Sequence, residues 1–186
     1  QEPEIFFPHQ LDFRGRAYPI PMFLNPQGVE YSRALLQFSK GERMGNNPES
    51  RKWLAIHGAN QYGEDKSSLE QRVEWVNKNE QYILESAEIP LEHDFWKSAD
   101  KPFCFLAFCF EWKSYKENGD NHLTHIPVAV DGTCNGLQVF SLLLRDEVGG
   151  AATNLIPSDT PQDIYKIVAD RAIEILKQET SNELYR

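Results

Sequence analysis

The sequence predicts a helix-rich α+β protein, with about eight helices around a small sheet. Residues that favour helix starts precede several stretches in which apolar residues recur at helical spacing. Only short segments have the continuous apolar character or the alternation of strands. At 186 residues, the chain is long enough for one good-sized domain or two small ones.

Local signals place the helices. A short helix is expected over residues 31–38, and the next one begins at Asn47 and Pro48, because proline is favoured at a first helical position. Ser67 and Glu70 have the spacing of a capping box, which predicts a helix that continues through Trp75. Further helices are expected over residues 81–87, 103–115, 135–144 and from residue 160 onward, and Pro102 suits the first helical position of the second of these.

The helix expected over residues 135–144 has two distinctive features. Asn135 and Gln138 have the spacing of a second capping box, with Asn135 as the cap. The helix is apolar on nearly every side through Leu144, which predicts that it is buried. Residues 116–121, by contrast, are polar and are expected to form an exposed loop.

Residues 126–130 form a short apolar run that predicts a buried strand, and Asp131 follows it directly. Gly132 then allows the backbone to turn and to approach a ligand. A carboxylate at the end of a rigid strand suits a hard cation, so Asp131 and the carbonyl of Gly132 are candidate metal ligands. Most Asp-Gly pairs, however, only close a strand through an Asx turn, and the segment by itself favours that structural role.

Two catalytic interpretations of Asp131 need different partners. A phosphatase with an aspartyl nucleophile needs a second aspartate two residues earlier, and Ala129 at that position excludes it. A Mg²⁺ ligand in phosphoryl or nucleotidyl transfer needs another acidic residue, because two-metal catalysis uses carboxylates that bridge ions about 4 Å apart.

Arg14 and Arg16 flank Gly15, with Asp12 before them and Tyr18 after them. On a strand, positions 12, 14, 16 and 18 would share one face, because side chains alternate. Such a row could hold phosphates through guanidinium contacts, with the tyrosine packed on a sugar or base. The structural alternative is a solvated arginine pair that the aspartate partly neutralises, and the residues alone favour it.

Composition limits the classes of function. The chain is 40% hydrophobic and 25% charged, and no run approaches the roughly 20 apolar residues of a membrane span. A net charge of −9 argues against a protein that coats nucleic acid, although a local basic groove stays possible. Three cysteines cannot all pair within the chain, and with His122 and His125 they match no zinc spacing. His57 is expected to be a core or interface histidine.

Several motifs follow one another in an order that resembles the single-subunit DNA-directed RNA polymerases of bacteriophages and mitochondria, with the phage branch the more similar. The resemblance covers nearly the whole chain. The motifs are DFRGRAY at 12–18, NPQG at 25–28, WLAIHGAN at 53–60, PFCFLAFCFE at 102–111, DGTCNGLQ at 131–138 and RDEVGG at 145–150.

This resemblance implies a partial polymerase palm domain with a helical insertion and a small antiparallel sheet. It assigns the first part of the palm to residues 1–45, the helical insertion to 46–123, the metal-motif strand and helix to 124–150, and the start of the fingers to 151–186. Asp131 then matches the first of two metal-binding aspartates, with Gly132 offering its carbonyl, and Mg²⁺ is the implied cofactor. The implied nucleic-acid-binding residues are Arg16 foremost, with Arg14, Asp12 and Tyr18 in support.

The implied reaction is attack of an RNA 3′-hydroxyl on the α-phosphate of a nucleoside triphosphate, with magnesium lowering the pKa of the hydroxyl. The implied partners are a DNA template, the RNA transcript, nucleoside triphosphates and the remainder of the polymerase chain, with no membrane. The implied location is the cytoplasm of an infected bacterial host, with the mitochondrion as the less favoured alternative.

The chain also departs from the family pattern. It has no segment with a second metal-binding aspartate and no nucleotide-binding helix of the fingers, and Val139 stands where relatives commonly have histidine. The isolated chain, which begins at Gln1, is therefore expected to be an inactive piece of a longer enzyme. The alternative is a non-catalytic module that binds nucleic acid.

Overall fold

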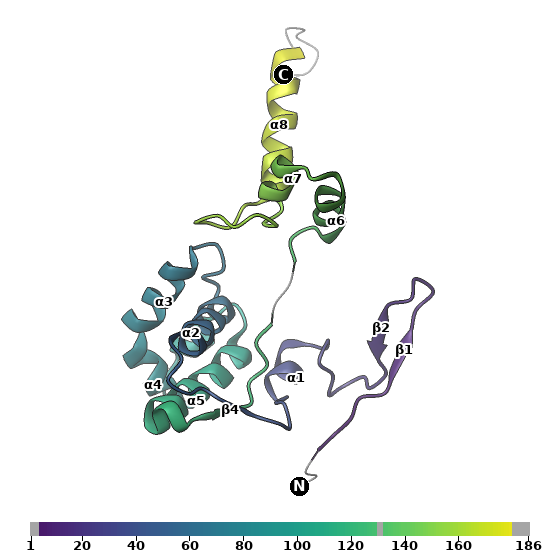
Figure 1. The fold of residues 1–186 in the computed structure, drawn as a ribbon. Helices are drawn as coiled ribbons and strands as arrows, with labels where there is room; N and C mark the ends of the chain where they lie inside the picture. Colours follow the sequence, from purple (N-terminus) through teal and green to yellow (C-terminus); the bar gives the residue numbers. More distant parts are fainter. Residues whose placement is uncertain (1–3, 130–131, 180–186) are drawn as a thin grey trace. The chain divides into compact units, whose positions relative to one another are not determined.

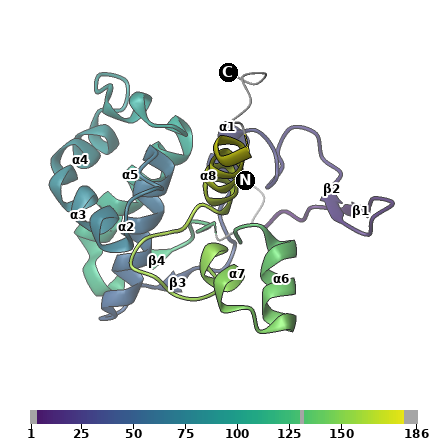
Figure 2. The same ribbon diagram turned by 90° about the horizontal axis from the view of Figure 1, so that it is seen from above.

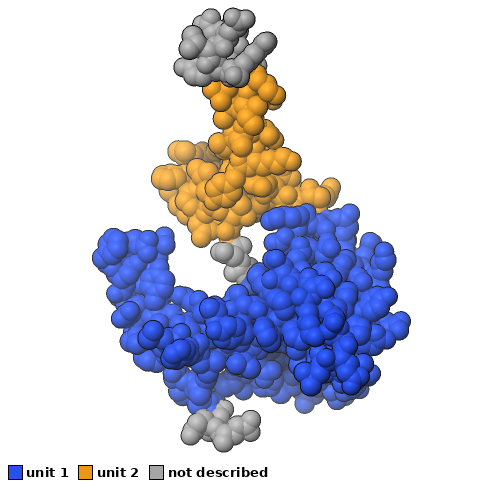
Figure 3. All heavy atoms as spheres, turned by 180° about the vertical axis from the view of Figure 1, so that it is seen from behind, with its two compact units in different colours: residues 1–129 blue, residues 130–186 orange. Residues whose placement is uncertain are grey.

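The computed structural model describes residues 4–129 and 132–179. The chain divides into two compact units, Gln1–Ala129 and Val130–Arg186 (Figures 1 and 3). Asp131 lies outside the described residues. None of the helices within the described ranges is long and apolar enough to cross a membrane.

Unit 1 contains a helical cluster and two small antiparallel sheets (Figure 1). Its helices are α1 (Glu30–Ala34), α2 (Pro48–Tyr62), α3 (Leu69–Lys78), α4 (Glu80–Glu88) and α5 (Pro102–Asn118), with the 3-10 helices η1 (Phe95–Ser98) and η2 (Gly119–Asn121). Its strands pair as β1 (His9–Leu11) with β2 (Ala17–Pro19), and β3 (Glu42–Arg43) with β4 (Leu123–Thr124). The prediction of a helix-rich α+β chain is confirmed.

Helix α5 forms the centre of the core. Phe105, Phe108 and Trp112 on this helix are fully buried, and α2 and α4 pack against it (Figure 2). Where α2 crosses α5, Gly58 lies directly against the ring of Phe108. The two helices can approach this closely because glycine has no side chain.

Unit 2 contains three helices, α6 (Asn135–Leu144), α7 (Glu147–Ala152) and α8 (Ile164–Glu179), among its described residues. Asp146 caps α7, because its carboxylate accepts a hydrogen bond from the backbone N–H of Val148 at 3.1 Å. Asp163 does the same at the start of α8, accepting from the N–H groups of Tyr165 and Lys166.

The prediction of a buried strand over residues 126–130 is wrong for its described part. Strand β4 ends at Thr124, and residues 125–129 have no regular secondary structure. Pro127 has no N–H to give to a ladder, and no described strand lies beside this segment. Ile126 still packs against the core, whereas Val128 is 40% exposed.

The prediction that residues 135–144 form a buried helix is right about the helix and wrong about its burial. Ser141 is the buried residue among the described positions of α6, whereas Phe140 and Leu144 are 63% and 75% exposed. The described part of unit 2 has too few elements to cover every side of this helix. The expected capping box is also absent, because Cys134 occupies the cap position and Gln138 bonds to α7 instead.

Two other helix boundaries differ from expectation. The capping box of α3 is one residue later than predicted: Ser68 accepts from the N–H of Gln71, and the Gln71 side chain accepts from the N–H of Ser68. The predicted exposed loop at residues 116–121 is instead the last turn of α5 followed by η2. The predicted starts of α2 at Asn47 and of α5 at Pro102 are confirmed.

The close approach of α2 and α5 gives a testable prediction for Gly58→Ala. The added methyl group would overlap the Phe108 ring, so we expect a loss of about 1–3 kcal/mol in the free energy of unfolding, as is usual for overpacked cores. Gly136→Ala is the matched control, because this helical glycine has open space around it and alanine is the better helix former. Urea unfolding of the chain, followed by circular dichroism, measures both, and equal stability of Gly58→Ala and the parent would contradict the packing described.

Candidate nucleic-acid and metal sites

Asp12 organises the tight loop between β1 and β2. One carboxylate oxygen, Oδ1, accepts hydrogen bonds from the backbone N–H groups of Arg14 at 2.8 Å and Arg16 at 3.0 Å. The loop also closes through its backbone, since the N–H of Asp12 donates to the carbonyl of Arg16. Gly15 has a φ of 78°, a left-handed conformation that glycine adopts without strain. The expected strand face with positions 12, 14, 16 and 18 in one row is therefore wrong, because residues 12–16 turn.

The two arginines of this loop have different environments. The guanidinium of Arg14 donates from Nε to Asp12 Oδ2 at 2.9 Å, forms an ion pair with that oxygen at 2.8 Å, and lies 3.3 Å from the hydroxyl of Tyr18. The side chain of Arg16 is exposed and forms no hydrogen bond or ion pair with the described residues. The guanidinium of Arg14 is thus held by its own loop, whereas the guanidinium of Arg16 is exposed and has no partner among the described residues.

The same contacts determine the ionisation of Asp12. The N–H of Arg16 is the main reason that the pKa of this carboxyl is lower than its ordinary value of 3.8, and the bonds from Arg14 lower it further. Hydrogen bonds to a carboxylate favour its charged form. The loop therefore depends on an ionised Asp12.

The candidate metal motif begins at Asp131, whose own position is not described. Gly132 follows, and a side chain at this position would overlap the carboxamide oxygen of Asn135. Cys134 has a φ of 54°, so the chain turns through a left-handed conformation as α6 begins. The sequence predicted a close approach of the backbone at Gly132, but it did not indicate that the side chain of Asn135 lies there.

The described residues do not complete a metal site. No group of three or more His, Cys, Asp or Glu side chains within the described ranges could hold a metal ion. Asp146, which follows α6, and Asp163, which directly precedes α8, accept hydrogen bonds from backbone N–H groups at the starts of α7 and α8. The two candidate donors at the motif, the carboxylate of Asp131 and the carbonyl of Gly132, are oxygens of the kind that Mg²⁺ prefers, and two such ligands would fill only part of its coordination sphere.

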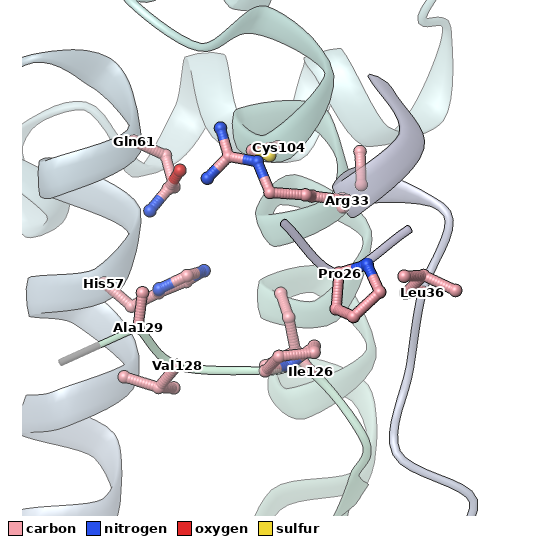
Figure 4. A pocket seen from close by; sticks show the side chains of 12 residues that line it. Pro26, Arg33, Leu36, His57, Gln61, Cys104, Ile126, Val128 and Ala129 are labelled. Atoms are coloured by element: carbon pink, nitrogen blue, oxygen red, sulfur yellow. The ribbon is translucent and has the colours of Figure 1, made fainter. Parts of the chain in front are cut away.

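A cavity of about 180 Å³ in unit 1 contains residues that sequence reasoning did not connect (Figure 4). His57 and Gln61, one turn apart on α2, line it together with Arg33, whose buried Nε has no hydrogen-bond partner among the described residues. Burial, and then the charge of Lys101, lower the pKa of His57 to about 4, so it is neutral near pH 7. The prediction of a core histidine is confirmed, since this side chain is 6% exposed.

Comparison with known proteins identifies the family. The sequence profile of DNA-dependent RNA polymerases matches residues 45–185. The chain is 48% identical over 178 residues to the DNA-directed RNA polymerase of Enterobacteria phage K11 and 47% identical over 178 residues to T7 RNA polymerase of Escherichia phage T7. It is 40% identical over 181 residues to the mitochondrial DNA-directed RNA polymerase of Neurospora crassa.

The chain belongs to the DNA-dependent RNA polymerase family. Each of these three matches covers 96% of the chain, but only 19%, 20% and 13% of the respective relatives. The chain thus spans about a fifth of the length of its phage relatives. The resemblance inferred from the motifs is confirmed.

The ionisation of Asp12 gives a prediction for the hairpin. Since its pKa in the folded state is lower than 3.8, the carboxylate stabilises the loop at pH values above its unfolded pKa, and this contribution is lost as the pH falls through the lowered value. In an NMR titration, we expect the side chain of Asp12 to titrate below pH 3.8 and the amide proton of Arg16 to shift with it. In Asp12→Asn that amide shift should vanish, and a normal or raised pKa for Asp12 would refute the loop geometry.

Proposed function

We propose that this chain is part of the palm and the start of the fingers of a DNA-directed RNA polymerase that adds nucleoside monophosphates to an RNA 3′ end on a DNA template. The observation that carries the proposal is the match to phage polymerases at 47–48% identity over 96% of the chain. The domain boundaries proposed from the sequence at residues 45, 123 and 150 belong to this assignment.

In this proposal Asp131 and Gly132 supply part of a Mg²⁺ site. A bound Mg²⁺ would lower the pKa of the attacking hydroxyl and offset charge at the phosphate. The carboxylate of Asp131 and the carbonyl of Gly132 provide hard oxygen ligands at adjacent positions. The second carboxylate would come from the remainder of the polymerase, and for this reason we expect the chain by itself to be inactive.

Arg16 is the proposed contact to nucleic acid. Its guanidinium is exposed, whereas Arg14 is paired with Asp12 at 2.8 Å. An unpaired guanidinium can hold a phosphate through two parallel hydrogen bonds. In this division of roles, Asp12, Arg14 and Tyr18 shape the loop that presents Arg16.

The metal role of Asp131 is testable in a chimera of T7 RNA polymerase in which this chain replaces the matching 178 residues. We expect Asp131→Ala to abolish template-dependent RNA synthesis and to leave promoter binding largely intact, because the carboxylate acts on the reacting atoms. Asp120→Ala removes an exposed aspartate of η2 and should retain activity. RNA synthesis by a folded Asp131→Ala chimera at the parent rate would exclude the proposed role.

The division of roles between the arginines gives a separate test in the same chimera. Arg16→Ala should shorten the lifetime of transcribing complexes. It should also lower the slope of their dissociation against salt concentration, on logarithmic axes, by about one, as expected for the loss of one phosphate contact. Lys66→Ala, which removes an equal charge from a side chain that is 91% exposed, is the control and should change neither quantity. An unchanged lifetime for Arg16→Ala would contradict the assignment.

A further inference from the structure

One carboxamide in unit 2 joins the loop after Asp131 to two other segments. Asn154 Nδ2 donates to the hydroxyl of Thr133 at 3.2 Å and to the carbonyl of Gln162 at 2.9 Å. Its Oδ1 accepts from the backbone N–H of Gln162 at 2.7 Å. Asn154 therefore bonds both to the residue two positions after Asp131 and to the segment that leads into α8.

The position of Asn154 is itself fixed by α7. Its φ is 59°, and its backbone N–H donates to the carbonyl of Ala151 at the end of that helix. Thr153, the preceding residue, is fully buried, donates from its hydroxyl to the carbonyl of Gly149 at 2.7 Å, and accepts from the side chain of Gln138 at 2.7 Å. Asparagine tolerates this left-handed conformation better than other residues with side chains. It is thus suited both to end the helix and to carry the bridge.

The other residues of the loop are held as well. Asn135 lies against Gly132. The side chain of Cys134 is the main reason that the pKa of Tyr165, on α8, is raised. Gly132 and Thr133 therefore each contact a different side chain of unit 2. The bond from Asn154 is the contact that links this loop to the end of α7.

We propose that Asn154 is a positioning residue for the metal-binding loop, which it orients through its hydrogen bond to Thr133. This inference rests on the proposed function, since it takes Asp131 as a Mg²⁺ ligand. Removal of a residue that orients a metal ligand typically lowers metal affinity or activity about 10- to 100-fold. A role confined to ending α7 would need the backbone conformation of Asn154 but not its amide group.

The test uses the polymerase chimera and measures Mn²⁺ binding by electron paramagnetic resonance, together with the Mg²⁺ concentration that half-saturates RNA synthesis. Asn154→Gly keeps the left-handed backbone and removes the carboxamide. We expect metal binding about 10-fold weaker, with promoter binding unchanged. Thr133→Val, which removes the acceptor hydroxyl, should have a similar effect, and Thr133→Ser, which retains it, should restore the parent value.

A double variant separates the contact from general destabilisation. Because Asn154→Gly and Thr133→Val remove the same hydrogen bond, their combined effect on metal binding should be clearly less than the product of the single effects. If Asn154→Gly does not fold, the comparison of Thr133→Val with Thr133→Ser tests the same bond from the other side.

Two outcomes would overturn different claims. Parent-like metal binding in Asn154→Gly or Thr133→Val, while Asp131→Ala loses it, would refute the positioning role and leave the proposed function intact. Metal binding that survives Asp131→Ala would refute the proposed metal site itself.

Discussion

The carboxamide of Asn154 is the interaction on which the candidate metal loop depends. It bonds to Thr133 and makes two bonds to the backbone of Gln162, so it connects three parts of unit 2 that are separate in sequence. Loops seldom keep a fixed shape by backbone propensity alone, because ordering each residue costs about 1–2 kcal/mol. A side chain that bonds to several loop segments at once offsets part of that cost.

Unit 1 follows the same principle at the hairpin of β1 and β2. There Asp12 accepts from two backbone N–H groups and from the Arg14 guanidinium, which leaves the second arginine exposed. The helical cluster of the same unit packs around the buried side chain of Phe108 on α5. One polar side chain thus shapes each loop, and a different residue is the one proposed to act on the ligand.

The sequence predicted features that depend on residues close together in the chain better than features that depend on residues far apart in it. The starts of α2 and α5 were predictable because Asn47 and Pro102 act within one turn of the chain. The exposure of α6 and the irregular structure at residues 126–129 were not predictable, because both depend on what packs beside these segments. The chain spans only about a fifth of the length of its phage relatives. At the candidate sites, the motif pointed to residues 12, 14 and 16 as candidates, but the difference between the two arginines required the loop geometry. Asn154 was not singled out, because its partner Thr133 lies 21 residues earlier.

We propose that the loop at Asp131 binds a divalent cation next to the reacting phosphate. The most direct measurement is Fe²⁺ substitution in the polymerase chimera, followed by peroxide and mapping of the peptide bonds that the resulting hydroxyl radicals cleave. We expect cleavage close to residue 131 that excess Mg²⁺ suppresses, together with cleavage in the T7 portion at the site of a second carboxylate. Metal-dependent cleavage that leaves the segment around residue 131 intact would contradict it.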